Sequence, residues 1–403
     1  MKKIQILLLI SLFSLTSCNT IKTVVLLKKG KVEENTYDKE IPITIINGTL
    51  GVVVKIEGKE YFLFFDTGAM NVLSEFVSKE LNLKPKVEME ATDVHNNQDV
   101  FYFTKVNAIE LSGITYKNQG AAVFDFSKIP EVECYSTDGI LGANLMRNSV
   151  WQINMQDSLF HITDNIDQLQ IPASALTLKF KPNISSTPIV TVKVGNVEFD
   201  DVVFDFGASG GIDLVYNETN FSALNVNSKI VEHYGSQSLG MFGGNFDTTY
   251  SFYVDSIQIG DLVYTNNLLH LRKTGTSTIG TTIFQNYIVT IDWDKEHIYL
   301  EPQPEFIKEE TDDYGISVRR IDGELTIIGL NSSTDAYAKG LQIGDRIMKV
   351  DDIDYSSMTD EQYCDMFKNG LFPEDSNSVE ITIERDSIVN TIQIKRKDWF
   401  DDF

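Results

Sequence analysis

The feature that most constrains the fold of this chain is an internal repeat. Three segments of its first half recur in the second half in the same order, and two of the three pairs align without a gap. The paired segments are 52–69 with 190–208, 106–119 with 254–267, and 141–162 with 279–300. Because such a repeat reflects one structural unit that is used twice, the sequence predicts two similar lobes in one chain.

The residue pattern favours β structure in both lobes. Glycine-punctuated runs of Val, Ile, Tyr, Phe and Thr dominate, and long amphipathic helical patterns are scarce. A length of 403 residues leaves room for two or three domains, each with its own core. The formal net charge of −24 argues against nucleic acid as a partner, because phosphates would repel such a surface. We therefore expect a mainly β fold that does not bind nucleic acid.

Each copy of the repeat carries an acidic residue directly after an apolar run. Asp66 and Asp205 occupy this position, and both precede a tripeptide of the form x-Gly-Ala. A carboxylate at the end of a buried strand is costly unless it is paired or used. Later in each copy, an apolar stretch closes on a glycine, at Gly142 and at Gly280. The duplication thus supplies two acids at equivalent positions.

This pattern resembles the pepsin and retropepsin family of aspartic proteases, over roughly residues 41–303. The resemblance implies a β-barrel lobe at 41–165, a second at 166–303, and a catalytic pair formed by Asp66 and Asp205 that shares a water molecule. It also implies supporting roles in the two acid loops for Thr67, Gly68, Ala69, Phe206, Gly207 and Ala208. The strands that thread behind the loops are then expected to contain Leu141 and Gly142 in one lobe and Ile279 and Gly280 in the other.

Paired carboxyl groups account for the need for one acid in each lobe. Two carboxylates a few ångströms apart cannot both ionise cheaply, so the pair holds one proton. The ionised member takes a proton from water while the protonated member polarises a peptide carbonyl, and this chemistry needs neither a metal nor a cofactor. No Cys/His cluster with the spacing of metal ligands occurs in the sequence. Because titration belongs to the pair, neither acid is assigned as the base.

Phe206 departs from the family pattern, which carries Thr or Ser at this position of the second loop. The two loop hydroxyl groups normally bond across the lobe junction, so Thr67 is left without a hydroxyl counterpart. The ring either packs as a wedge that leaves Asp205 in place or displaces the loop and abolishes activity. Two hypotheses follow: an aspartic endopeptidase, and a catalytically degenerate lipoprotein that binds peptides.

A serine hydrolase is a rival interpretation of the second loop. Residues 207–211 match G-x-S-x-G, the pattern of a nucleophile elbow. An elbow needs a strand before the serine and a helix after it, and residues 211–225 have a poor helical pattern. The repeat also places this stretch in an acid loop, which disfavours the serine interpretation.

A hairpin flap over the cleft is expected in the second lobe at 234–246. Gly240, Gly243 and Gly244 would form its mobile tip, although a plain flexible turn fits the same residues. The equivalent segment of the first lobe, 91–100, is polar and contains no glycine.

Residues 314–398 resemble a PDZ domain, which follows an acidic linker at 304–313. Tyr314, Gly315 and Ile316 match its carboxylate-binding loop, and 359–369 match the helix that forms the second wall of its groove. The resemblance implies a small α+β domain that takes up a C-terminal peptide as an added strand. The alternative is a PDZ domain that packs on the protease and binds nothing.

The first 17 residues have two lysines and a short apolar run, which is typical of a signal peptide. The run ends in Leu15-Thr16-Ser17-Cys18, which resembles a bacterial lipobox and implies lipidation of Cys18. Residues 18–40 would then be a tether that anchors the chain to a membrane of the bacterial cell envelope, although the apolar patch at 23–27 could pair with something.

The two remaining cysteines, Cys134 and Cys364, fall in segments assigned to different domains. This assignment predicts two core cysteines rather than a structural disulfide, despite the oxidising compartment.

Overall fold

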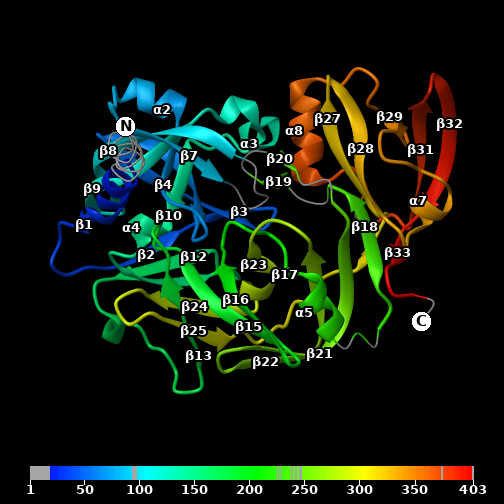
Figure 1. Cartoon of the computed structure of the whole chain (residues 1–403). Coiled ribbons are helices and arrows are strands. Elements are labelled where there is room, and N and C mark those ends of the chain that lie inside the picture. Colours follow the sequence, from blue (N-terminus) through cyan, green and yellow to red (C-terminus); the bar gives the residue numbers. More distant parts are fainter. Residues whose placement is uncertain are drawn as a thin grey trace, which may run out of the picture.

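The structure is a computed structural model, and it describes residues 19–92, 98–224, 226, 228–236, 239–240, 243–244, 247–373 and 375–401. The expected signal peptide and Cys18 lie outside the described residues, so both stay predictions. Within the described part of the chain, no helix has the length and apolar character to cross a membrane. Figure 1 shows the first lobe in blue to cyan, the second in green to yellow, and a C-terminal domain in orange to red.

The first lobe is built on a nine-stranded sheet with short helices at its margins. Its strands are β1 (Lys31–Val32), β3 (Thr44–Ile46), β4 (Thr49–Ile56), β5 (Lys59–Asp66), β6 (Val72–Ser74), β7 (Pro85–Thr92), β8 (Gln98–Leu111), β9 (Ile114–Phe124) and β10 (Gly139–Gly142). Its helices are α2 (Glu75–Glu80), α3 (Pro130–Cys134) and α4 (Ala143–Met146). Alternation along β5 buries Tyr61, Leu63 and Phe65 on one face, which leaves Asp66 on the other.

The second lobe repeats this strand order, as the sequence repeat predicts. Its strands are β14 (Lys181–Pro182), β15 (Pro188–Val194), β16 (Val197–Phe204), β17 (Ile212–Val215), β18 (Val231–Gly235), β19 (Leu239–Gly240), β20 (Gly243–Gly244), β21 (Thr249–Ile259), β22 (Leu262–Arg272) and β23 (Ser277–Ile279). Its helices are α5 (Glu218–Ala223) and α6 (Thr281–Phe284). The hairpins β15–β16 and β21–β22 correspond to β4–β5 and β8–β9, and β23 corresponds to β10.

A six-stranded sheet joins the two lobes. Its order is β13 (Leu176–Lys179), β25 (His297–Pro302), β24 (Tyr287–Asp292), β11 (Val150–Asn154), β12 (Leu159–Thr163) and β2 (Asp38–Pro42). Strand β11 of the first half pairs with β24 of the second, and one hydrophobic cluster runs through both lobes. The fold is therefore mainly β and bilobal, as predicted.

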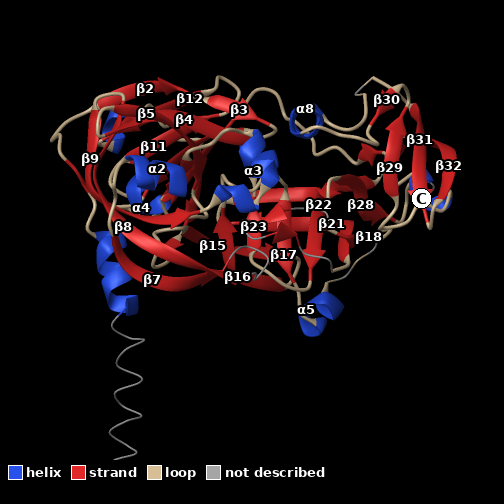
Figure 2. Cartoon of the chain, turned by 90° about the horizontal axis from the view of Figure 1, so that it is seen from above, coloured by secondary structure: helices blue, strands red, loops and turns tan. Residues whose placement is uncertain are grey.

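The C-terminal domain has its own hydrophobic cluster of strands and two helices. It contains β27 (Ile316–Ile321), β28 (Glu324–Asn331), α7 (Asp335–Ala338), β29 (Arg346–Val350), β30 (Ile353–Asp354), α8 (Asp360–Asn369), β31 (Ser378–Arg385) and β32 (Ile388–Lys395), while β26 (Asp312–Asp313) pairs with β33 (Lys397–Asp398). Strand β28 also pairs with β18 of the second lobe, so one sheet continues from the lobe into this domain. Figure 2 shows the domain beside both lobes.

The segment expected to be a tether is instead packed on the first lobe. Residues 19–28 are helical, and the Leu27 side chain is only 1% exposed. Strand β1 pairs with β9, and β2 pairs with β12. The tether prediction was therefore wrong from about residue 23 onward, because the apolar patch at 23–27 packs on the surface of the first lobe.

The prediction of two separate core cysteines was also wrong. Cys134 and Cys364 form a disulfide that joins α3 of the first lobe to α8 of the C-terminal domain. Their Cα atoms lie 4.9 Å apart, although the residues are 230 positions apart in sequence. The prediction failed because the two domains pack against each other through these helices.

Candidate active site

Each acid lies at the end of a central strand with a parallel strand beside it. Asp66 is the last residue of β5, where β10 aligns Leu141 with Phe65 and Gly142 with Asp66. In the second lobe, Asp205 directly follows β16, and β23 aligns Ile279 with Phe204. The structure thus places the two expected apolar strands behind the two acid loops.

Main-chain contacts tie each loop to the segment behind it. The N–H of Ala143 donates to the carbonyl of Ala69 over 2.8 Å, and the N–H of Thr281 donates to the carbonyl of Ala208 over 2.8 Å. A Cβ atom on Gly280 would lie 2.5 Å from the Ala208 carbonyl oxygen. This crossing therefore requires glycine, which explains why an apolar stretch ends in one.

The two acids meet at the lobe junction. A Cβ atom on Gly68 would lie 2.5 Å from Oδ2 of Asp205, and one on Gly207 would lie 2.4 Å from Cγ of Asp66. Each loop glycine thus packs directly on the carboxylate of the opposite lobe, and no side chain fits at either position. The Asp66 and Asp205 carboxyl groups interact directly with each other.

Local hydrogen bonds orient both carboxyl groups. The N–H of Ala69 donates to Oδ1 of Asp66 over 2.9 Å, and the N–H of Gly207 donates to Oδ1 of Asp205 over 2.7 Å. Burial raises the pKa of both carboxyl groups, and the charge of Asp205 raises the pKa of Asp66 further, well above its ordinary value. A hydrogen bond from the Gly68 N–H lowers the pKa of both acids and so partly offsets the upward shift. The pair therefore keeps a proton to a higher pH than an isolated carboxyl group would.

Thr67 bonds across the junction to the backbone of the second loop. Its fully buried hydroxyl donates to the Phe204 carbonyl over 2.6 Å and accepts from the Phe206 N–H over 2.9 Å. The contact on the side of the second loop is thus made by backbone groups and does not depend on the side chain at position 206.

The Phe206 ring does not lie between the two acids. It is fully buried, and its centroid lies 5.6 Å from that of Phe65 and 4.6 Å from that of Phe284. Phe65 faces the core, away from Asp66, so the ring packs beneath the loops. Of the two outcomes expected for Phe206, the structure has the wedge that leaves Asp205 in place.

The second loop lacks the geometry of a nucleophile elbow. Ser209 is followed by strand β17 rather than by a helix, and α5 begins only at Glu218. The Ser209 carbonyl accepts a hydrogen bond from the Thr282 hydroxyl over 2.9 Å. The serine interpretation therefore has no structural support.

Both lobes have a hairpin at the place expected for a flap. In the second lobe, β18 and β21 pair, and between them β19 pairs with β20 so that Gly240 faces Gly243 and Gly244 faces Leu239. In the first lobe, β7 pairs with β8, and residues 93–97 between these strands lie outside the described residues. The three glycines thus belong to a small hairpin at the end of a larger one.

A partly buried chain of polar side chains links the second hairpin to the Asp205 loop. His233 Nε2 lies 2.8 Å from Ser251 Oγ, which lies 2.7 Å from His270 Nδ1, and His270 Nε2 lies 2.9 Å from Glu309 Oε1. A Cβ atom on Gly211 would lie 2.3 Å from Oε2 of Glu309. Ser251 is 1% exposed, so it cannot reach a substrate. No local sequence signal predicts this chain, because its members lie on three strands and the linker.

The two histidines of this chain have pKa values that are shifted in opposite directions. Burial and the neighbouring His270 lower the pKa of His233 to about 3. Burial also lowers the pKa of His270, but Glu309 outweighs this effect and the net shift is upward. His233 is therefore neutral near pH 7, while Glu309 favours the protonated form of His270.

The loop predicted to bind a carboxylate is partly occupied by the chain itself. Gly315 has a φ of +71°, and a Cβ atom there would lie 2.2 Å from the Thr334 hydroxyl, so the loop requires glycine. Its N–H bonds the exposed carboxyl group of Asp313, which also accepts a hydrogen bond from the Trp399 indole N–H over 2.9 Å. Tyr314 packs on Phe372, and Ile316 begins β27.

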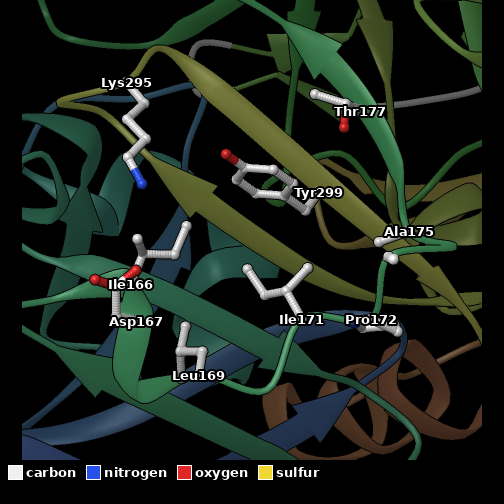
Figure 3. Close-up of a pocket in the computed structure, with 10 residues that line it drawn as sticks. Ile166, Asp167, Leu169, Ile171, Pro172, Ala175, Thr177, Lys295 and Tyr299 are labelled. Atoms are coloured by element: carbon white, nitrogen blue, oxygen red, sulfur yellow. The ribbon is translucent and has the colours of Figure 1, made fainter.

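One cavity of the described structure lies apart from the two acid loops. It measures about 480 Å³ and lies between the segment 166–177 and strand β25 (Figure 3). Lys295 and Tyr299 line one side, and apolar side chains such as Ile166 and Leu169 line the other. None of its lining residues belongs to a loop that carries Asp66 or Asp205.

Comparison with known proteins bears on the first lobe. No curated protein matches the sequence. Residues 52–145 match the family model described as aspartyl protease, and this range contains the Asp66 loop and strand β10 behind it.

Proposed function

We propose that this chain is an aspartic endopeptidase of the bacterial cell envelope. The observation that carries the proposal is that the loop glycine of each lobe packs directly on the carboxyl group of the opposite lobe, which brings Asp66 and Asp205 together at the junction. The raised pKa values of both carboxyl groups agree with this placement. The match of residues 52–145 to aspartyl proteases supports the same reaction class. The substrate is an extended peptide or an unfolded protein that lies between the lobes.

The chain's own residues account for each step of hydrolysis. The carboxyl pair holds one proton and a water molecule, and its ionised member removes a proton from that water. The protonated member donates a hydrogen bond to the substrate carbonyl, which stabilises the oxyanion of the tetrahedral intermediate. The C–N bond then breaks as the carboxyl group that took the proton from water gives it to the leaving nitrogen, and the pair holds one proton again. Thr67 and the loop glycines keep the two carboxyl groups at their separation.

We further propose that the C-terminal domain is a PDZ domain that recruits substrate tails or regulates access to the cleft. A regulatory role is supported by the pairing of β28 with β18, because β18 forms one arm of the second flap hairpin. Anchoring through a lipid on Cys18 is supported by the lipobox pattern in the sequence.

A second candidate function is peptide binding without catalysis. Phe206 favours it, since the second loop lacks the hydroxyl that the resemblance leads one to expect. The cleft and the groove of the C-terminal domain would then both hold extended peptides.

Cleavage of an unfolded protein and a peptide library by purified protein distinguishes the two functions. Asp66→Asn and Asp205→Asn should each reduce kcat at least 100-fold, while Asp201→Asn, an exposed acid on β16, should leave it unchanged. If the wild-type protein and the Asp66→Asn variant leave the library equally intact from pH 3 to pH 8, the protease is excluded. Retained library binding would then favour the second function.

A further inference from the structure

Helix α3 of the first lobe bridges the two walls of the candidate peptide groove. These walls are strand β27 and helix α8. The Glu131 carboxylate of α3 accepts from Arg319 of β27 at 2.9 and 3.2 Å, and from the Tyr363 hydroxyl of α8 at 2.6 Å. One residue later along α8, Cys364 is bonded to Cys134 of α3. A single short helix of the protease thus contacts both sides of the groove.

The Glu131 contact is buried and charge-assisted. The residue is only 3% exposed, yet hydrogen bonds from Arg319 and Tyr363 outweigh the effect of burial and lower the pKa of its carboxyl group. A buried carboxylate with these partners is stable only while they stay in place. The contact therefore favours one docked position of the C-terminal domain.

The edge of β27 that faces α8 is covered by the same group of residues. Among the described strands, β27 pairs with β28 alone, so its other edge is where a peptide strand would add. The backbone N–H of Arg320 is directed at the Tyr363 hydroxyl, and the Arg320 guanidinium lies over the Tyr363 ring and bonds Asp360 at 2.6 Å. An incoming strand would have to displace Tyr363 from this edge.

Aromatic packing continues the contact toward the Asp66 strand. Tyr135, directly after α3, packs edge-to-face on Phe64 of β5 and on Phe367 of α8. The Asn47 side chain donates to the Phe367 carbonyl over 3.2 Å. The position of α8 is thus fixed from β5, which ends in Asp66.

We propose that the Cys134–Cys364 disulfide is a redox latch that holds α3 over the groove between β27 and α8 and excludes peptides from it. A dithiol reductant opens the latch: it supplies two electrons and two protons, becomes a disulfide, and leaves Cys134 and Cys364 as thiols. Cys364 is the half-buried partner and Cys134 the buried one, so attack begins at Cys364. The inference rests on the proposed peptide groove and deepens it by stating when that groove is open.

The latch is tested in an Asp66→Asn background, so its outcome does not depend on catalysis. Amide hydrogen exchange is measured over 314–322 and 359–369 in three samples: oxidised protein, protein reduced with dithiothreitol, and the Cys134→Ser/Cys364→Ser variant. We expect exchange in β27 to become at least tenfold faster in the last two samples. Dithiothreitol should have no effect on the double variant, which shows that it acts through this disulfide.

Peptide binding is measured on the same samples with a library of decapeptides that have free carboxyl termini and a matched library with amidated termini. We expect the reduced protein to bind the free-carboxyl library at least tenfold more tightly than the oxidised protein does. The Glu131→Gln variant keeps the disulfide. Its amide exchange in β27 should therefore increase, relative to the oxidised protein, by less than that of the reduced protein.

Each failure has a distinct meaning. Unchanged exchange in β27 after reduction overturns the latch. Faster exchange without binding of either library overturns the assignment of the groove, whereas loss of proteolysis by the wild-type protein bears only on the proposed protease. If the double variant is unfolded by circular dichroism, the reduced Asp66→Asn protein with both cysteines in place supplies the same test.

Discussion

Replacement of Thr67 by valine tests whether its hydroxyl holds the two lobes in register. Valine has nearly the same shape but can neither donate to the Phe204 carbonyl nor accept from the Phe206 N–H. Both groups lie at a fully buried site, and an unpaired buried polar group costs about 1–3 kcal/mol. Thr67→Val should therefore lower the free energy of unfolding by roughly 2–6 kcal/mol.

Thr67→Ser is the matched control, because it keeps the hydroxyl and removes one methyl group. Its expected cost is about 1 kcal/mol, the value of a small buried apolar group. Both variants are compared by urea denaturation and by kcat on a cleavable peptide. We expect kcat to fall at least tenfold in Thr67→Val only, since the loop with Asp205 loses its anchor. Equal stability and equal kcat in the two variants would refute the cross-lobe role of the hydroxyl.

Three further predictions follow from the same site. Gly207→Ala should lower kcat at least 100-fold, because the new Cβ atom would lie 2.4 Å from Cγ of Asp66. The control Gly210→Ala should leave kcat unchanged, because a Cβ atom there has no neighbouring atom within 4 Å. Similar kcat values for the two variants would count against the packed carboxyl pair. Phe206→Ala should destabilise the protein by about 3–5 kcal/mol in urea, because it empties a buried aromatic cluster, and a change below about 1 kcal/mol would mean that the ring is not packed as described. The raised pKa of Asp66 means that the folded state binds its proton more tightly than the unfolded state does, so this contribution to stability is present at low pH and is lost as pH rises above the ordinary value of 3.8. Between pH 3 and pH 7, the melting temperature should thus fall less steeply with rising pH in Asp66→Asn than in the wild type. Equal slopes of melting temperature against pH in the two proteins would contradict the shift. Activity should also be lost as pH rises through the raised pKa of the pair.

The sequence repeat correctly predicted two similar mainly β lobes, and it placed Asp66 and Asp205 at equivalent strand ends. These features can be predicted from the sequence because they depend on residues that are close to one another along the chain. Alternation along a strand decides which side chains are buried, and a glycine where the chain crosses itself leaves a visible signature. The packing of Phe206 could not be read in this way, because the direction of its ring depends on Phe65 of the other lobe and on Phe284.

By itself, then, the sequence determined the two-lobe β fold and the acid in each loop, because both arise from local patterns that the duplication repeats. Tertiary structure alone decided how distant segments meet. It paired Cys134 with Cys364, packed residues 23–40 on the first lobe, and aligned His233, Ser251, His270 and Glu309 in one chain. The physical reason is that these contacts depend on the relative positions of whole domains, which are set by the sum of many weak surface interactions and leave no periodic trace in the residues that make them.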